Sequence, residues 1–183
     1  MNMIRNRWAF LPLLFAAFLD VSVGNQFAYA QRPANLFSMC QYSGHFTSSG
    51  PINKGGGDLD VVIGRELFTS IMSAWAYGGS AACRIRPGNS GYKYKTLRLA
   101  FGIQDENSEN YNCRKPMTVN VYLDGNLAES RSLLPSEKSL LLLNVSRTST
   151  VTVDVPRIGE SGFGGTCWGV VYFTQAILEP ISR

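Results

Sequence analysis

Apolar and polar residues alternate in several short stretches of this sequence, and this period of two constrains the fold more than any other feature. The clearest alternation covers residues 92–104, 117–123 and 150–155, and an apolar stretch at 167–178 ends the series. A period of two places successive side chains on opposite faces of a β-strand. Clusters of Gly, Pro, Asn and Asp separate the stretches at intervals of about ten residues, as in β-sandwiches and barrels. We therefore predict an all-β fold, an antiparallel sandwich of about eight strands.

Three other segments do not follow this simple alternation. Residues 68–77 follow neither the helical nor the strand period, so we expect irregular backbone with pieces of strand, interrupted at Gly78-Gly79. Residues 139–145 form a continuous apolar run, which is typical of a strand covered on both faces. Asp124-Gly125 or Gly125-Asn126 supplies a tight turn between two strands.

The first thirty residues are typical of a secretory signal. Arg5 and Arg7 precede an apolar run at 8–19, and Ala28-Tyr29-Ala30 fits the small-x-small cleavage rule. The alternative is an uncleaved anchor, but the run is shorter than the roughly twenty residues that span a bilayer. We expect residues 1–30 to be removed, leaving a secreted or periplasmic protein without a stable membrane span. Residues 31–57 would then form an N-terminal strand and flexible loop, and residues 58–183 the sandwich domain.

All four cysteines lie after the predicted signal. An even number of cysteines in an exported chain indicates two disulfides, and three connectivities are open. Cys113 and Cys167 each precede an apolar strand, which places them at the same end of a sandwich. We therefore expect the pairs Cys113–Cys167 and Cys40–Cys83.

Metal and cofactor sites are not expected from this sequence. It contains no CxxC motif and a single histidine, His45, which argues against zinc. Asp58 and Asp60 follow a glycine-rich loop and are weak calcium candidates, because calcium prefers several oxygen ligands. Acidic residues at the start of a strand are the preferred interpretation, so structural calcium is the one cofactor left open.

The net charge of +4 gives no reason to expect a nucleic-acid partner. One stretch without acidic residues carries Arg84, Arg86, Lys93, Lys95 and Arg98. Such a patch could attract an anionic polymer, although a solvated strand and loop surface is the preferred interpretation.

The series VIGRELFTSIMSAWAYGGSAACRI, YKYKTLRLAFGIQDE, MTVNVYLDGNLAES, VTVDVP and CWGVVYFTQAIL, within residues 58–178, resembles the NPCBM domain. This family consists of carbohydrate-binding modules found beside some glycosidases. The resemblance implies a galactose-binding-like jelly roll and a non-catalytic, exported module that binds cell-wall or extracellular polysaccharide. Two positions depart from the family pattern. Trp75-Ala76-Tyr77 stands where the family tends to have a histidine-containing segment, and Gly169-Val170 stands where it has an acidic residue.

Carbohydrate binding needs aromatic platforms for the apolar faces of sugar rings and polar side chains for the hydroxyl groups. The candidate platforms are Trp75, Tyr77 and Tyr111, with Asn110 and Arg114 as polar partners. Tyr111 is the strongest candidate because it lies in a wholly polar loop, where nothing explains its burial.

No catalytic constellation is visible, so we do not expect an enzyme. His45 has no nucleophile or orienting acid assigned to it, and the acidic residues at 105–109 are those of a solvated loop. The alternative to carbohydrate binding is an exported structural or protein-interaction β-sandwich without a sugar site. The sequence does not identify a protein partner for it.

Overall fold

The computed structural model describes residues 32–48, 59–105, 116–158 and 169–181. These residues are nearly all in strands, which are β1 (Ala34–Asn35), β2 (Cys40–Ser48), β3 (Leu59–Ile63), β4 (Glu66–Ser70), β5 (Met72–Arg84), β6 (Tyr94–Ile103), β7 (Met117–Leu123), β8 (Asn126–Leu133), β9 (Lys138–Asn144), β10 (Thr150–Val155) and β11 (Val170–Pro180). One 3-10 turn, Leu36–Met39, follows β1. None of the described residues forms a helix long and apolar enough to cross a membrane.

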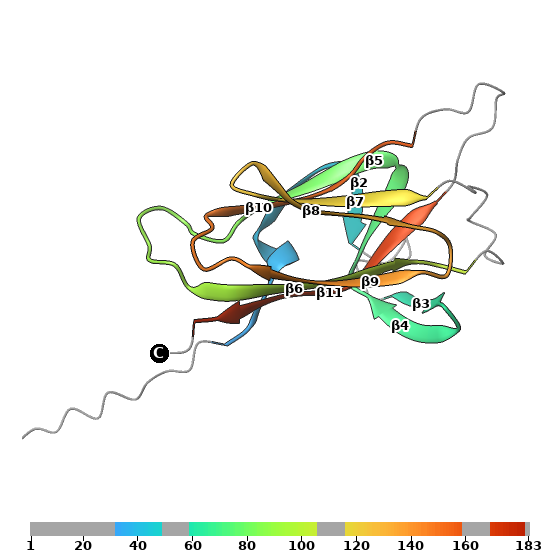
Figure 1. Cartoon of the computed structure of the whole chain (residues 1–183), viewed down its shortest axis with the longest axis horizontal. Helices are drawn as coiled ribbons and strands as arrows, with labels where there is room; N and C mark the ends of the chain where they lie inside the picture. The colour runs from blue at the N-terminus through green and yellow to red at the C-terminus, as the bar shows by residue number, and fades with distance from the viewer. Residues whose placement is uncertain (1–31, 49–58, 106–115, 159–168, 182–183) are drawn as a thin grey trace, which may run out of the picture.

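Two layers of antiparallel strands face each other (Figure 1). The main sheet has nine strands and follows the order β8-β7-β10-β5-β11-β6-β9, with β2 beside β5 and β1 beside β11. The long strand β5 joins the layers, because its second half pairs with β10 and its first half pairs with β11. This arrangement confirms the predicted antiparallel β-sandwich, here with a barrel-like sheet.

The core between the layers is built from the inward residues of the alternating strands, and four phenylalanines meet at its centre. The ring of Phe173 lies 5.3 Å from Phe37, 5.5 Å from Phe46 and 5.7 Å from Phe101, centroid to centroid. Two of these rings come from the segment before residue 50. The N-terminal strands therefore belong to the same core as the rest of the sandwich.

The predicted Cys40–Cys83 disulfide is confirmed. The two cysteines lie directly opposite each other in the β2–β5 pair, with a sequence separation of 43 residues. Cys113 and Cys167 lie outside the described residues, so their pairing stays a prediction.

The prediction of irregular structure over residues 68–77 is wrong. β4 and the thirteen-residue strand β5 run through this segment. The alternation is hidden because the outward positions of β5 carry Trp75 and Tyr77, which are half-buried. Gly78-Gly79 does not interrupt β5 either. A Cβ on Gly79 would lie 2.9 Å from the carbonyl oxygen of Ser43, so this glycine lets β2 approach closely.

The prediction that residues 139–145 are covered on both faces is also wrong. Leu141 and Leu143 of β9 point into the core, but Leu140 and Leu142 are 52% and 59% exposed. The outer face of the sheet is covered by the β3–β4 hairpin, which packs on β11 and β5 and leaves most of β9 open.

Both tight hairpins depend on two residues with positive φ. Asp124 (49°) and Gly125 (82°) form the turn between β7 and β8, as the sequence predicts. Gly64 (59°) and Arg65 (69°) form the turn between β3 and β4. Positive φ at both central positions is the geometry that matches the twist of a two-residue hairpin.

Candidate functional site

The β3–β4 hairpin packs on the outer face of the layer that contains β11 (Figure 1). Val61 and Ile63 of the hairpin are buried against Val170 and Tyr172 of β11, and Trp75 of β5 packs at the margin. Burial in this cluster raises the pKa of the Tyr172 phenol. The cluster is separate from the main core, so the hairpin forms a ridge on the surface of the sandwich.

Gly102 of β6 lets the hairpin approach the sheet. A Cβ at this position would lie 2.9 Å from Cγ2 of Ile63 and 2.8 Å from the carbonyl oxygen of Glu137. Contacts this short force a neighbour to move, and one of the two neighbours is backbone. A side chain at position 102 would therefore displace the hairpin or the turn before β9.

Asp105 ties the hairpin to the end of β6. Its Oδ1 accepts a hydrogen bond from the backbone N–H of Gly64 at 2.8 Å, and its own N–H donates to the carbonyl of Val62 at 3.2 Å. Desolvation acts to raise the pKa of Asp105. Hydrogen bonds from Gly64, Ser136 and Arg65, together with the charge of Arg65, outweigh desolvation and lower this pKa below 3.8.

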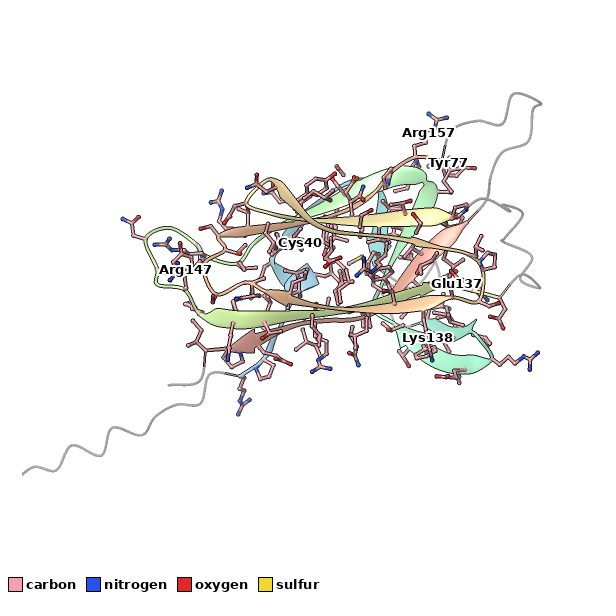
Figure 2. All side chains as sticks on the ribbon, viewed as in Figure 1. Cys40, Tyr77, Glu137, Lys138, Arg147 and Arg157 are labelled. Carbon is pink, nitrogen blue, oxygen red and sulfur yellow. A yellow bond between two sulfur atoms is a disulfide. The ribbon has the colours of Figure 1, made fainter. Side chains whose placement is uncertain are left out.

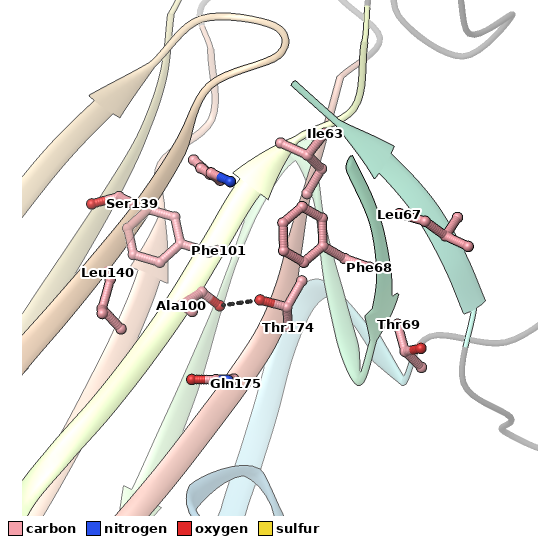
Figure 3. Close-up of a pocket in the computed structure, with 11 residues that line it drawn as sticks. Ile63, Leu67, Phe68, Thr69, Ala100, Phe101, Ser139, Leu140, Thr174 and Gln175 are labelled. Atoms are coloured by element: carbon pink, nitrogen blue, oxygen red, sulfur yellow. Dashed lines mark hydrogen bonds between the residues drawn. The ribbon is translucent and has the colours of Figure 1, made fainter. Parts of the chain in front are cut away.

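A groove of about 680 Å³ lies between the hairpin and β9, and we call it the hairpin groove (Figure 3). Residues 67–69 of β4 form one wall and residues 138–140 of β9 form the other. Ala100 of β6 and Thr174 and Gln175 of β11 lie between the walls. This volume is within the range of about 300–1,000 Å³ that is usual for ligand pockets.

A β-bulge shapes the floor of the groove. The pairing of β11 with β6 shifts register between Phe173 and Gln175. Consecutive residues of a regular strand face opposite sides, but the bulge turns both Thr174 and Gln175 to the outer face. Thr174 Oγ1 donates to the carbonyl of Ala100 at 3.5 Å, whereas the Gln175 side chain is exposed.

The hairpin groove extends towards the N-terminal strand. A second hollow of about 320 Å³ is bounded by residues 33–35 and by Ile71, and it shares Thr174 and Gln175 with the first. The two side chains of the bulge therefore stand in the middle of a longer depression that crosses the outer face of the sheet.

The hairpin groove carries little net charge. Among the described residues that line it, Lys138 is the one titratable side chain. Its Nζ lies 2.7 Å from Glu66 Oε2 and 5.1 Å from the centroid of the Phe68 ring. The remaining polar groups of the lining are hydroxyls and one amide. Such a lining can hold a neutral polar ligand.

Two of the predicted binding residues lie outside this groove. Trp75 and Tyr77 share the outer face of β5, as their spacing of two requires, and both are half-buried. Trp75 packs beneath the hairpin, and the Tyr77 ring lies 5.2 Å from the ring of His45. Figure 2 shows Tyr77 on the upper layer, beside Arg157.

The other predicted binding residues, Asn110, Tyr111 and Arg114, lie outside the described residues. So does the calcium candidate Asp58, whereas Asp60 accepts a hydrogen bond from Thr69 Oγ1 at 3.1 Å. Within the described ranges, no three His, Cys, Asp or Glu side chains are grouped so that they could hold a metal ion.

One feature of the sequence does mark two of the groove residues that we did not predict. Thr174-Gln175 is a polar pair inside the apolar run at 170–178. A polar pair within such a run indicates a strand that departs from regular alternation, as a bulge does.

Comparison with known proteins identifies the fold. No protein-family model matches the sequence, and no curated protein matches it. The CBM51 module from Clostridium perfringens GH95, solved in complex with methyl-galactose, has a TM-score of 0.57 and 13% identity, over 80% of this chain and 99% of that one. The tandem CBM51 modules of Sp3GH98, a family 98 glycoside hydrolase from Streptococcus pneumoniae SP3-BS71, have a TM-score of 0.55 and 12% identity to this chain. This match covers 80% of this chain and 46% of that one.

A third solved structure contains the CBM51-2 and INT domains of Clostridium perfringens ZmpB. It has a TM-score of 0.55 and 15% identity to this chain, and the match covers 80% of this chain but 31% of that one. Identities this low establish the fold rather than the ligand. The structural neighbours are carbohydrate-binding modules, and this chain has their β-sandwich fold.

Proposed function

We propose that this chain is an exported, non-catalytic carbohydrate-binding module of the NPCBM type, which holds a neutral cell-wall or extracellular polysaccharide in the hairpin groove. The observation that carries the proposal is the neutral groove with a bulge in its floor, on a fold shared with carbohydrate-binding modules. The Cys40–Cys83 disulfide supports an oxidising, extracytoplasmic location.

The chemistry of the groove suits a sugar chain. Leu67 and Leu140, which are 69% and 52% exposed, offer apolar surface to the C–H faces of sugar rings. The amide of Gln175 can both donate and accept hydrogen bonds, as a sugar hydroxyl requires of its partner. Lys138 is neutralised by Glu66, so the groove does not favour an anionic ligand.

Affinity electrophoresis and titration calorimetry test this function. The ligands would be methyl-galactose, N-acetylglucosamine and soluble neutral polysaccharides such as galactan and xyloglucan. We expect the wild-type protein to be retained by at least one polysaccharide, and Gln175→Ala to weaken that binding about tenfold through lost hydrogen bonds. Gln41→Ala, an exposed glutamine of β2 outside the groove, is the matched control and should bind as wild type.

Further variants separate the function from the site. If Tyr77→Ala or Tyr111→Ala abolishes binding while Gln175→Ala is silent, the module binds carbohydrate but through the aromatic residues predicted from the sequence. If the wild-type protein is retained by none of the glycans, the carbohydrate-binding function itself is wrong.

A protein-interaction role is the second candidate, and one observation favours it. Leu67, Leu140 and Leu142 expose 69%, 52% and 59% of their surface on the outer face of the sheet. Contiguous exposed apolar surface is typical of protein contacts. Light scattering across a concentration series distinguishes the two roles. Self-association that Leu140→Ser and Leu142→Ser abolish, without glycan binding, would support the second role.

A further inference from the structure

Five cationic side chains gather at the end of the sandwich opposite the hairpin. They are Arg84, Arg86, Lys93, Lys95 and Arg147, and we call this region the basic end. Figure 2 shows Arg147 at this end, far from the Lys138 label of the hairpin groove. The five residues come from the end of β5, the following loop, the start of β6 and the turn between β9 and β10.

Backbone hydrogen bonds hold these segments side by side. The N–H of Arg86 donates to the carbonyl of Ser149 at 3.2 Å, and the N–H of Val145 donates to the carbonyl of Lys95 at 2.8 Å. Arg84 lies opposite Thr150 in the β5–β10 pair. The fold thereby adds Arg147, which is distant in sequence, to the basic stretch at 84–95.

The charge of the basic end is not neutralised by the surrounding residues. Arg84, Lys93, Lys95 and Arg147 are exposed, and among the residues that the structure describes no acidic side chain forms an ion pair with any of the five. The nearby Asp124 carboxylate accepts the N–H groups of Ser149 and Thr150 at 3.0 and 2.8 Å and keeps its negative charge, but within the described part of the chain it forms no ion pair with the five cations.

Nearby cations not paired with acids raise the local concentration of anions. Interactions between exposed charges of this kind steer anionic partners, and they weaken as salt is added. Four of the five cations are exposed on the surface, so a polymer or an extended surface can contact several of them at once.

The basic end also has an aromatic ring. Tyr92 is 41% exposed, and the guanidinium Cζ of Arg86 lies 4.3 Å from the centroid of its ring. Arg86 is held there by a hydrogen bond from its Nε to the carbonyl of Ser90 at 2.6 Å. A fixed guanidinium stacked over one face of an exposed ring places a cation next to apolar ring surface, which matches a sugar ring that carries a carboxylate or sulfate group.

We infer that the basic end is a second binding surface, separate from the hairpin groove, for an acidic polysaccharide. Arg84, Lys93 and Arg147 contact its carboxylate or sulfate groups, and Tyr92 contacts its sugar rings. A nucleic acid fits less well, because single-stranded chains are bound on a series of stacked aromatic side chains, and Tyr92 is the one exposed ring that the described residues of loop 85–93 contribute here. The inference does not require the groove to bind a neutral glycan.

Binding of polygalacturonate and heparin, measured by titration calorimetry at low and high salt, tests this inference. We expect both polyanions to bind at low salt and to dissociate as salt screens the charges. The double variant Lys93→Gln, Arg147→Gln should weaken this binding about tenfold, since it removes two exposed charge contacts that each contribute a few-fold in affinity. Both side chains are exposed, so the variant should fold as wild type.

A matched double variant removes the same charge elsewhere. Arg65→Gln, Arg131→Gln also eliminates two exposed cations, and it should leave polyanion binding within a factor of about two or three of wild type. Equal loss in both double variants would show that net charge alone is responsible and would overturn the inference. Tighter binding of a DNA oligonucleotide or of anionic phospholipid vesicles than of polygalacturonate, at the same ionic strength, would overturn it as well.

The two binding proposals fail separately. Gln175→Ala should not change polygalacturonate binding, and Lys93→Gln, Arg147→Gln should not change binding of a neutral glycan. If Gln175→Ala weakened polygalacturonate binding as much as the basic-end variant does, there would be one site rather than two.

Discussion

The two ends of the sandwich use charge in different ways. At the hairpin end, carboxylates bind near neighbours: Asp105 accepts from Gly64 N–H at 2.8 Å, Asp60 from Thr69 at 3.1 Å, and Glu66 lies 2.7 Å from Lys138. At the basic end, four exposed cations have no acidic partner among the described residues. Charge at the hairpin end shapes a ridge and its groove, whereas charge at the basic end is available to a partner.

The ends also differ in how they are attached to the core. The β3–β4 hairpin is an addition on the outer face, held by a small cluster of its own. The basic end is made of the strand ends of the main sheet, joined to one another by backbone hydrogen bonds. We therefore expect perturbations of the core to affect both ends, and perturbations of the hairpin contacts to affect only one.

Removing the Cys40–Cys83 disulfide should have the largest effect. Because the cysteines have a sequence separation of 43 residues, loss of the cross-link should lower the free energy of unfolding by about 4 kcal/mol. Urea unfolding of the Cys40→Ser, Cys83→Ser variant measures this loss. Hydrogen exchange should show that both ends lose protection together. If protection fell only around residues 84–95, the basic end would be an independent unit and the shared core would be a wrong premise.

Gly102→Ala should act on the hairpin end alone. The added Cβ would meet Ile63 and the carbonyl oxygen of Glu137 within 3 Å, and overpacking of this kind costs about 1–3 kcal/mol. Glycan binding in the hairpin groove should weaken as the hairpin shifts, while polygalacturonate binding at the basic end should not change.

Gly91→Ala is the matched control for that substitution. A Cβ at Gly91 meets nothing within 4 Å, so its effect on the urea midpoint should be small. Equal destabilisation by the two substitutions would mean that the hairpin does not depend on close approach at Gly102.

The strands that have one buried and one solvated face were predictable from the sequence. β7 and β10 begin and end where the alternation does, at 117–123 and 150–155, because burial on one side leaves a clear period of two. The first half of β5 is not recognisable from the sequence, because the hairpin covers part of its outer face and apolar residues therefore occupy both faces of the strand there. The same hairpin stops short of β9, so the apolar run in β9 does not mean that both faces of this strand are covered.

The candidate groove could not be predicted from the sequence. It joins residues near 67, 100, 139 and 174, which only the strand order of the sheet brings together. A shift of register at one residue also decides that Gln175 faces outwards. In contrast, the spacing of Trp75 and Tyr77 does place them on one face, but local spacing does not reveal that Trp75 supports a hairpin.

The smallest expected effect separates the ends by pH. The pKa of Asp105 is lowered from 3.8, so its contribution to hairpin docking is complete above pH 3.8 and is lost as the pH falls through the lower value. Nuclear magnetic resonance measures this through the amide proton shift of Gly64, which donates to Asp105 Oδ1. Between about pH 6 and about pH 2, that shift should titrate with a midpoint below the ordinary aspartate value.

Asp105→Asn should abolish this titration, and it should leave the amide shifts of the basic end at their wild-type values at each pH, because Asp105 follows the end of β6 and the basic end lies at the start of that strand. A midpoint at or above 3.8 would contradict the hydrogen-bonding argument, since an Asp105 that gained nothing from Gly64 would be dominated by desolvation. If Asp105→Asn instead moved the amide shifts of the basic end as well, the hairpin and the common core would be coupled. In that case the hairpin would not be a separately attached element.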